Sequence, residues 1–317
     1  MQPRTKRLDH LLVGFFLCKE AEGCSPNTII EYKKDFAHFS RWLGERDPAE
    51  LTAADLQAFL AELRSKPNGH GKPLSAKTVY NCWVALRAFY KWQAQERGVP
   101  NVMLSVPAPK FAEAVIEPLS KEQVGAILKA CDGTREAKTK GRAQFTMRRD
   151  NALRDKAIIM VLLDAGLRAG ELCALTIGDV DLSSGRILIR EGKGGKGRLA
   201  YLGKQARRAL WRYLSQRQET KRTDWLFLTR EDRPLTPDRL VKLFRNLGER
   251  AGVDNLHPHR LRHTFATQFL RNGGNLLGLQ RLLGHASLEM VRRYAVIAEV
   301  DLARAHETGS PADRWRL

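Results

Sequence analysis

Apolar residues in the first hundred positions recur every three or four residues, which is the spacing of helices that bury one face. Ser25 followed by Pro26 predicts a helix start, because serine caps a helix and proline fits its first turn. Two further helices are predicted to begin at Thr52, ending before Pro67, and at Ser75. The first of these three helices carries an aromatic stripe that we interpret as core rather than as a surface for stacking bases: Tyr32, Phe36, Phe39 and Trp42.

The helical pattern breaks between Gly98 and Pro118, where four prolines occur and no periodicity survives. This stretch predicts a linker. The sequence Ser120 to Gln123 has the form of a capping box and predicts a clean helix start after it. The resulting division is a helical domain over residues 1–99, a linker over 100–117, and a second domain over 118–317 with a tail from about residue 300.

The second domain contains a run, from about residue 150 to 164, that is apolar nearly all round and predicts a buried central helix ending at Gly166. Two short runs rich in Ile and Leu, Arg186–Arg190 and Arg198–Leu202, flank a glycine-rich segment with two lysines and predict a β-hairpin. The fold class is therefore mainly α with a small antiparallel β-sheet. Further helices are predicted at about 204–219, 237–251, 258–272, 275–283 and 287–297.

The charge balance of the chain indicates what kind of partner it binds. Lys and Arg number 54 against 35 Asp and Glu, so the formal net charge is +19. A surface this positive favours nucleic acid first and an anionic membrane surface second. The segment 133–149 holds six basic residues and one acid, and it fits a solvated loop and a loop lying against DNA equally well.

The apolar runs are too short for a membrane span, since Ala157–Leu163 has seven residues and a span needs ~20. No signal-peptide pattern follows the basic N-terminus, so we expect no membrane partner and a location in the cytoplasm with the nucleoid. The five cysteines lack C-x-x-C spacing, which indicates neither a disulfide framework nor a zinc ribbon. We expect them to be reduced and packed as small apolar side chains: Cys18, Cys24, Cys82, Cys131 and Cys173.

The sequence His257-Pro258-His259-Arg260-Leu261-Arg262-His263 begins a predicted helix whose buried face is marked by Leu261, Phe265 and Phe269. His259 and Arg262 are three apart and can face one target beside a helix N-terminus, which favours anions. A guanidinium and an imidazole together suit a phosphate. A solvated helix edge is the alternative. The histidine cluster could also indicate a zinc site. However, no H-E-x-x-H arrangement or cysteine pair supports a metal, and we expect none.

Two other segments gain meaning only in combination with this one. Arg168 follows the buried central helix, and Glu171 either simply neutralises it or orients it towards a phosphate. Leu283-Gly284-His285 forms a turn before a helix opened by Ser287, and that helix carries Tyr294. Taken alone, Tyr294 fits an ordinary half-buried core residue.

The motifs occur in a fixed order: Gly-Leu-Arg-x-x-Glu-Leu, a Gly-Lys-Gly hairpin, His-x-Leu-Arg-His, and Leu-Gly-His nine residues before a tyrosine. In this order they make the chain resemble the tyrosine recombinases, the phage-integrase and Xer-like family, over nearly its whole length. The resemblance implies an N-terminal helical core-binding (SAM-like) domain and a C-terminal, mostly helical catalytic domain.

The resemblance also implies a role for each matching position. Arg168 and Arg262 would clamp the scissile phosphate, and Lys193 would act as general acid towards the leaving 5′ oxygen. His259 would assist proton transfer, His285 would hydrogen-bond the phosphate, and Tyr294 would be the nucleophile. Arginines, a lysine and imidazoles neutralise the developing charge without a metal, and a phosphotyrosine conserves bond energy without ATP, so no cofactor is expected. Supporting positions are Glu171, Lys196 (an alternative to Lys193 in the hairpin tip) and His263.

The partner implied by the resemblance is double-stranded DNA with a specific recombination site. Members of the family work as a tetramer on two duplexes, with a C-terminal tail that docks onto a neighbouring copy, and some need an accessory directionality protein or a partner recombinase. Five polar positions of the N-terminal domain could contact the phosphate backbone, although a solvated face explains them as well: Lys33, Arg41, Lys77, Asn81 and Arg87.

The expected function is therefore site-specific recombination: integration, excision, transposition or dimer resolution. One alternative is a type IB topoisomerase-like enzyme, which shares the tyrosine chemistry but reseals the same strand. Another is a DNA-binding protein that has kept this fold and lost catalysis. The filled catalytic positions argue against the latter.

Overall fold

The structure is a computed structural model, and it describes residues 5–67, 71, 73–111, 116–133, 149–190, 197–217, 220–284, 306 and 310–315. The chain forms two compact units, Met1–Val115 and Ile116–Leu317, which are described separately here. None of the helices in the described part of the chain is long and apolar enough to cross a membrane.

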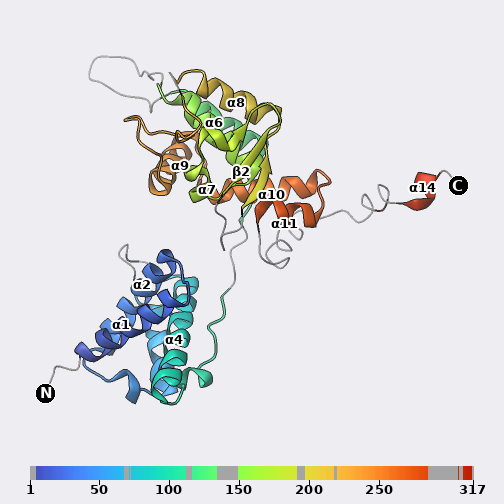
Figure 1. The fold of residues 1–317 in the computed structure, drawn as a ribbon. Helices are drawn as coiled ribbons and strands as arrows, with labels where there is room; N and C mark the ends of the chain where they lie inside the picture. The colour runs from blue at the N-terminus through green and yellow to red at the C-terminus, as the bar shows by residue number, and fades with distance from the viewer. Residues whose placement is uncertain are drawn as a thin grey trace. The chain divides into compact units, whose positions relative to one another are not determined.

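The regular elements described in the N-terminal unit are all helices (Figure 1). The predicted helix starts are confirmed: Ser25 Oγ accepts a hydrogen bond from Thr28 N at 3.2 Å, and Ser75 Oγ accepts one from Thr78 N at 3.1 Å. Thr52 and Asp55 form a reciprocal capping box. The helices are α1 (Thr5–Ala21), α2 (Pro26–Leu43), α3 (Ala53–Ser65) and α4 (Ala76–Arg97), with short 3-10 helices at Pro48–Glu50 and Val102–Ser105.

An aromatic cluster forms the core of this unit. Phe15 of α1 lies within 5.7 Å, between ring centroids, of both Phe36 and Phe89, and both pairs meet edge to face. Phe36 and Phe39 of the predicted stripe are fully buried, and Tyr32 and Trp42 are partly buried against the same core. The interpretation of the stripe as core is therefore confirmed.

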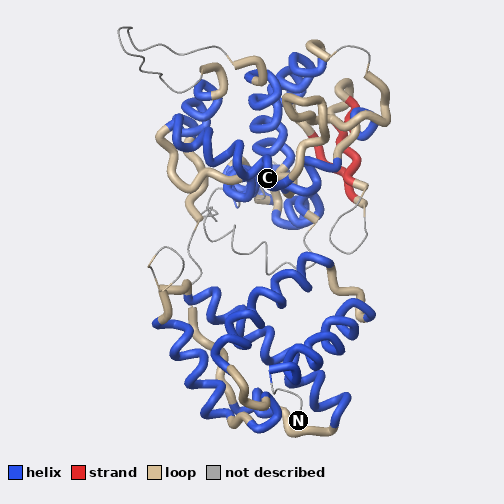
Figure 2. The backbone as a smooth tube through the Cα atoms, turned by 90° about the vertical axis from the view of Figure 1, so that its left-hand side faces the viewer, coloured by secondary structure: helices blue, strands red, loops and turns tan. Residues whose placement is uncertain are grey.

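The second unit is also mostly helical, with one small sheet (Figure 2). The sheet has the order β1-β2-β3, with β1 at Val180–Asp181, β2 at Arg186–Ile189 and β3 at Arg198–Tyr201. The predicted hairpin is confirmed by antiparallel pairing of Ile187 with Ala200. The helices are α5 (Lys121–Ala130), α6 (Ala152–Ala165), α7 (Ala169–Ala174), α8 (Lys204–Leu214), α9 (Pro237–Ala251), α10 (Pro258–Arg271), α11 (Leu276–Leu283) and α14 (Pro311–Trp315).

Helix α6 is the predicted central helix, and it packs against both α8 and α10 (Figure 1). Its apolar residues belong to one core that also includes residues of α5, the sheet, α8 and α9. Helix α8 ends at Leu214 rather than near 219. The predicted helix at 287–297 lies outside the described residues, as does most of the basic segment 133–149.

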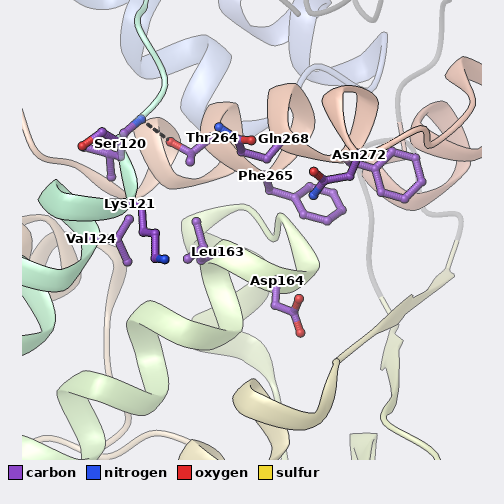
Figure 3. Close-up of a pocket in the computed structure, with 11 residues that line it drawn as sticks. Ser120, Lys121, Val124, Leu163, Asp164, Thr264, Phe265, Gln268 and Asn272 are labelled. Atoms are coloured by element: carbon purple, nitrogen blue, oxygen red, sulfur yellow. Dashed lines mark hydrogen bonds between the residues drawn. The ribbon is translucent and has the colours of Figure 1, made fainter. Parts of the chain in front are cut away.

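The predicted buried face of α10 was wrong in part. Leu261 is fully buried, but Phe265 and Phe269 are only half-buried and line a recess of about 440 Å³ together with Leu163 (Figure 3). The side of α10 that is covered instead carries Arg262, Ala266 and Leu270. Ala266 and Leu270 pack against α11, so the position of α11 rather than the spacing of the aromatic residues sets which face is buried.

Gly166 brings the end of α6 close to α10 and α11. Its φ is +59°, in the left-handed region, and a Cβ at this position would overlap the ring of Phe265 and touch Leu283. Glycine is therefore required here for two reasons, the backbone conformation and the close approach.

We expect Gly166→Ala to lower the free energy of unfolding of this unit by about 3 kcal/mol, since strain and overlap add. Gly252→Ala is the matched control: Gly252 also ends a helix with a positive φ, +65°, but has open space around it. Gly252→Ala should lower the free energy of unfolding by only about 1 kcal/mol. Urea-dependent hydrogen exchange of the α6 amides measures both. Equal losses in the two variants would show that the close packing at Gly166 contributes nothing.

Candidate active site

Glu171 lies at the centre of the site. It stands in the first turn of α7, and its Oε2 accepts a hydrogen bond from the backbone N–H of Arg168 at 2.7 Å. The guanidinium of Arg168 donates to the other oxygen, Oε1, also at 2.7 Å. The carboxylate thus fixes both the backbone and the side chain of Arg168, which remains 30% exposed.

A second guanidinium binds the same carboxylate. Arg198, the first residue of β3, donates through Nη1 to Oε1 and through Nη2 to Oε2, each at 2.7 Å. The Nη1 of Arg262 lies 4.0 Å from Oε2. One buried negative charge therefore faces three arginines, which leaves a local excess of two positive charges.

These contacts shift the titration of the carboxylate. Burial by itself would raise the pKa of Glu171, but the hydrogen bonds from Arg198 and Arg168 outweigh it and lower the pKa to about 2. Glu171 is therefore ionised at every physiological pH.

The same three arginines hold the C-terminal end of α11. Arg198 Nε donates to the carbonyl of Leu282 at 2.8 Å, and Arg262 Nη2 donates to that of Leu283 at 2.7 Å. Arg168 Nη2 lies 3.4 Å from the carbonyl of Gly284, which ends the helix with a φ of +63°. Cations suit this end of a helix because its carbonyls carry partial negative charge. The turn that they fix leads directly to His285 in the sequence.

Arg262 is also anchored to the end of α6. Its Nη1 donates to the carbonyl of Gly166 at 2.6 Å, and its side chain is only 1% exposed. A solvated helix edge is therefore wrong as an explanation of Arg262. His259, three residues earlier, is exposed instead.

The histidines stand at the start of α10. His257 Nδ1 accepts a hydrogen bond from Arg260 N at 3.3 Å and so caps the helix. The rings of His259 and His263 meet edge to face at 4.7 Å. The His259 ring is partly shielded from water although the residue has an exposed edge, and this desolvation, with the positive charges of Arg262 and Arg168, lowers its pKa. Burial lowers the pKa of His263 to about 4. Both imidazoles are therefore neutral at pH 7 and able to accept a proton or a hydrogen bond.

The structure thus brings together Arg168, Glu171 and Arg262 of the predicted site, with His259 within electrostatic reach of both arginines. Glu171 pairs with Arg168 and fixes its side chain, and the orientation of Arg168 towards a phosphate stays a prediction. His263, predicted as supporting, lies against His259. Four further predicted catalytic or supporting residues lie outside the described residues: Lys193, Lys196, His285 and Tyr294. Within the described part, no group of His, Cys, Asp and Glu could hold a metal ion.

Arg198 was not predicted as a site residue, although the sequence contains a signal for it. Along β3, side chains alternate between the two faces, and Ala200 points into the core. Arg198, two positions earlier, shares that inward face, and an inward arginine needs a buried carboxylate. Strand alternation combined with charge would have singled it out.

The five candidate DNA-contacting residues of the N-terminal unit are all exposed. Three of them stand beside aromatic rings: Lys33 lies 5.4 Å from the Phe16 centroid, Lys77 lies 4.7 Å from that of Phe111, and Arg87 lies 5.1 Å from that of Trp83. Arg41 follows Lys33 on α2, and Asn81 lies between the other two on α4. The five cysteines are free, as predicted, and Cys82, Cys131 and Cys173 are buried.

The chain is similar to known proteins over nearly its whole length. Residues 117–299 match the model of the phage integrase family, and residues 11–97 match that of the phage integrase N-terminal SAM-like domain. The chain is 30% identical over 311 residues to the tyrosine recombinase XerC of Chromobacterium violaceum, covering 98% of this chain and 94% of the relative. It is 31% identical to the tyrosine recombinase XerA of Thermococcus kodakarensis, covering 91% of each. The chain belongs to the phage integrase family of tyrosine recombinases.

Solved structures share the fold. The Tn1549 transposon integrase, in complex with transposon right end DNA, superposes with a TM-score of 0.70 at 20% identity, covering 90% of this chain and 94% of that one. The XerH site-specific recombinase, bound to a palindromic difH substrate, gives 0.68 at 23% identity, covering 93% and 83%. The predicted fold class, a mostly helical chain with a SAM-like domain and a small antiparallel sheet, is confirmed.

We expect Glu171→Gln to destabilise the second unit by about 3 kcal/mol at pH 7, because it leaves the arginines around it without a counter-charge. The pKa of Glu171 is lowered from 4.5 to about 2, so its charge stabilises the fold fully above pH 4.5. That contribution is lost as the pH falls towards 2. The difference in free energy of unfolding between wild type and Glu171→Gln, called the gap below, should therefore narrow as the pH falls.

Hydrogen exchange of the α6 and α10 amides at pH 7 and at lower pH measures the gap. The matched control is Glu231→Gln, which removes an exposed pair with Arg239 at 3.0 Å and should change stability little. A gap that stays constant with pH would contradict the assignment of the lowered pKa to Glu171.

Proposed function

We propose that this chain is a site-specific DNA recombinase that cleaves one strand by attack of Tyr294 on a backbone phosphate and forms a 3′-phosphotyrosine. The observation that carries the proposal is the arginine cluster around Glu171, which holds two of the expected phosphate ligands at the turn leading to His285. Membership of the tyrosine recombinase family supports the same reaction.

The cluster suits phosphoryl transfer because it supplies fixed positive charge where negative charge develops. Arg168 is 30% exposed, and its contact with Gly284 is long at 3.4 Å, so this Nη2 can turn to a phosphate oxygen while Nη1 stays on Glu171. Arg262 is 1% exposed and held by two carbonyls, so it contributes a rigid, fixed positive charge beside Arg168. Rigidity matters because a donor that needs no reorganisation stabilises the transition state most.

The Tyr294 oxygen bonds to phosphorus as its proton passes to the neutral imidazole of His259, and the bond from phosphorus to the 5′ oxygen breaks. Lys193 protonates that leaving oxygen, with Lys196 as the alternative donor, while His285 hydrogen-bonds the phosphate. The 5′ hydroxyl of a partner strand then attacks the phosphotyrosine and releases Tyr294, so strands are exchanged without ATP.

The proposed substrate is double-stranded DNA carrying a recombination site. The similar transposon integrase and XerH were solved bound to DNA, and the exposed basic positions on α2 and α4 suit a phosphate backbone. The net charge of +19 supports the same partner. We place the protein with the nucleoid in the cytoplasm, where an accessory directionality protein or partner recombinase would meet it.

We further propose self-association to a tetramer on two duplexes through the C-terminal tail. Trp315 of α14 is 72% exposed, so its large apolar ring is accessible to a neighbouring copy. The recess that Phe265 and Phe269 line, between α5, α6 and α10, is apolar enough to receive tail residues of a neighbouring copy (Figure 3).

Covalent trapping tests the proposed chemistry. Wild type and Tyr294→Phe are incubated, without metal or nucleotide, with nicked suicide duplexes. The duplexes are drawn from a library that includes the DNA flanking the gene of this protein. Wild type should give a protein–DNA band on a denaturing gel, and Tyr294→Phe should give none while binding the same DNA. A band from both variants would contradict Tyr294 as nucleophile. The lack of a band on every duplex that wild type binds would favour a binding protein without catalysis.

A further inference from the structure

We infer that Arg198 is a positioning residue for strand cleavage, one that ties the base of the hairpin to Arg168 and to the turn before His285. The inference rests on the proposed function and names a residue that the motifs of the site do not include.

The position of Arg198 is fixed by the hairpin itself. It pairs with Ile189 across the β2–β3 ladder, at the end of the hairpin nearest the segment that carries Lys193. A Cβ on the preceding residue, Gly197, would lie 3.2 Å from the carbonyl oxygen of Ile189, so the chain is tightly packed there. The guanidinium of Arg198 therefore starts from a rigid base.

Arg198 uses all three guanidinium nitrogens on two distant segments. Two bind Glu171, 27 positions away, and the third binds the carbonyl of Leu282, 84 positions away, at 2.8 Å. The side chain is 9% exposed, against 30% for Arg168. Turning Arg198 towards a phosphate would break these bonds, so it acts through other residues rather than on the substrate.

One of those residues is Arg168. Its Nη1 and the Nη1 of Arg198 share the same oxygen of Glu171, each at 2.7 Å. Arg168 by itself donates one hydrogen bond to each oxygen of Glu171, and Arg198 adds a second bond to each, so the carboxylate is held by four bonds from two sides. Without Arg198, the orientation of Glu171, and with it that of Arg168, is less constrained.

The other target is the turn at Gly284. A Cβ on Gly284 would lie 2.9 Å from Cδ of Arg198, so the turn rests directly on the arginine stem. Arginine is specific for this place, because a lysine has one nitrogen and cannot bind both carboxylate oxygens and a carbonyl in fixed directions. The sequence that continues from this turn contains His285 and Tyr294.

Removal of Arg198 also has a consequence that depends on pH. Within the described part of the chain, the charged groups within 4.0 Å of Glu171 are Arg168 from its own helix, Arg198 from β3 and Arg262 from α10. Burial still favours the neutral acid when Arg198 is lost, so the pKa of Glu171 should rise towards its ordinary range or above it. A protonated Glu171 holds Arg168 less firmly, and cleavage should then weaken as the pH falls.

The test compares three full-length variants with wild type: Arg198→Gln, Arg198→Lys and the control Arg186→Gln. Arg186 is an exposed arginine of the same hairpin, so the control removes the same charge from β2. For each protein, the DNA dissociation constant, the single-turnover rate of covalent trapping and the thermal midpoint are measured. The trapping rates are compared as ratios to wild type between about pH 8 and about pH 5.5, so the histidines common to all proteins cancel.

We expect Arg198→Gln to slow trapping on the order of 10²-fold with little change in DNA affinity, the loss that misplaced catalytic groups produce. Its ratio to wild type should fall further as the pH is lowered. Arg198→Lys should keep a flat ratio, because it retains a charge beside Glu171, but remain slower than wild type. Arg186→Gln should match wild type.

Trapping by Arg198→Gln at the wild-type rate would overturn the inference. So would a loss of trapping that is matched by losses of DNA affinity and thermal midpoint and shows no dependence on pH. If Arg198→Gln does not fold, Arg198→Lys provides the test. Trapping by Arg198→Lys at the wild-type rate would show that the contact of the guanidinium with both oxygens of Glu171 is not required. A wild type that forms no covalent adduct instead contradicts the proposed function.

Discussion

The buried carboxylate of Glu171 is the interaction on which the rest of the site depends. A charge this deep is stable only when it is paired and hydrogen-bonded on all sides, and here two arginines bind it directly while a third stands at 4.0 Å. The arginines in turn would repel one another without it. Neither side of this cluster is stable alone, so the geometry of each member is set by the others.

The cluster joins segments that are far apart in the sequence. Arg168 follows α6, Arg198 opens β3, and Arg262 lies in the first half of α10, yet all three reach successive carbonyls at the end of α11. Gly166 permits this convergence, because its lack of a side chain lets α6 end against Phe265 and Leu283. A phosphate ligand built in this way is rigid before the substrate arrives, which is the condition for electrostatic stabilisation of a transition state.

Local signals in the sequence were sufficient for much of the fold. Ser25, Thr52 and Ser120 cap helices as predicted, because a cap depends only on residues within one turn. Contacts between distant segments were harder to predict. The partner of Arg198 is Glu171, 27 positions away, and no residue near Arg198 in the sequence indicates that pairing. The buried face of α10 was misjudged at Phe265 because apolar spacing was weighed and the burial of Arg262 was not. The strand β1 has two residues, too few to show a pattern.

A double-mutant cycle between Glu171 and Arg198 tests the central claim most directly. The trapping rates of Glu171→Gln, Arg198→Gln and the double variant are compared with wild type at one pH on the same suicide DNA. If the two residues act as one unit, the double variant should be about as slow as the slower single variant, because the first change already removes what the second would. Losses that multiply would show that the two residues act independently and would contradict the account.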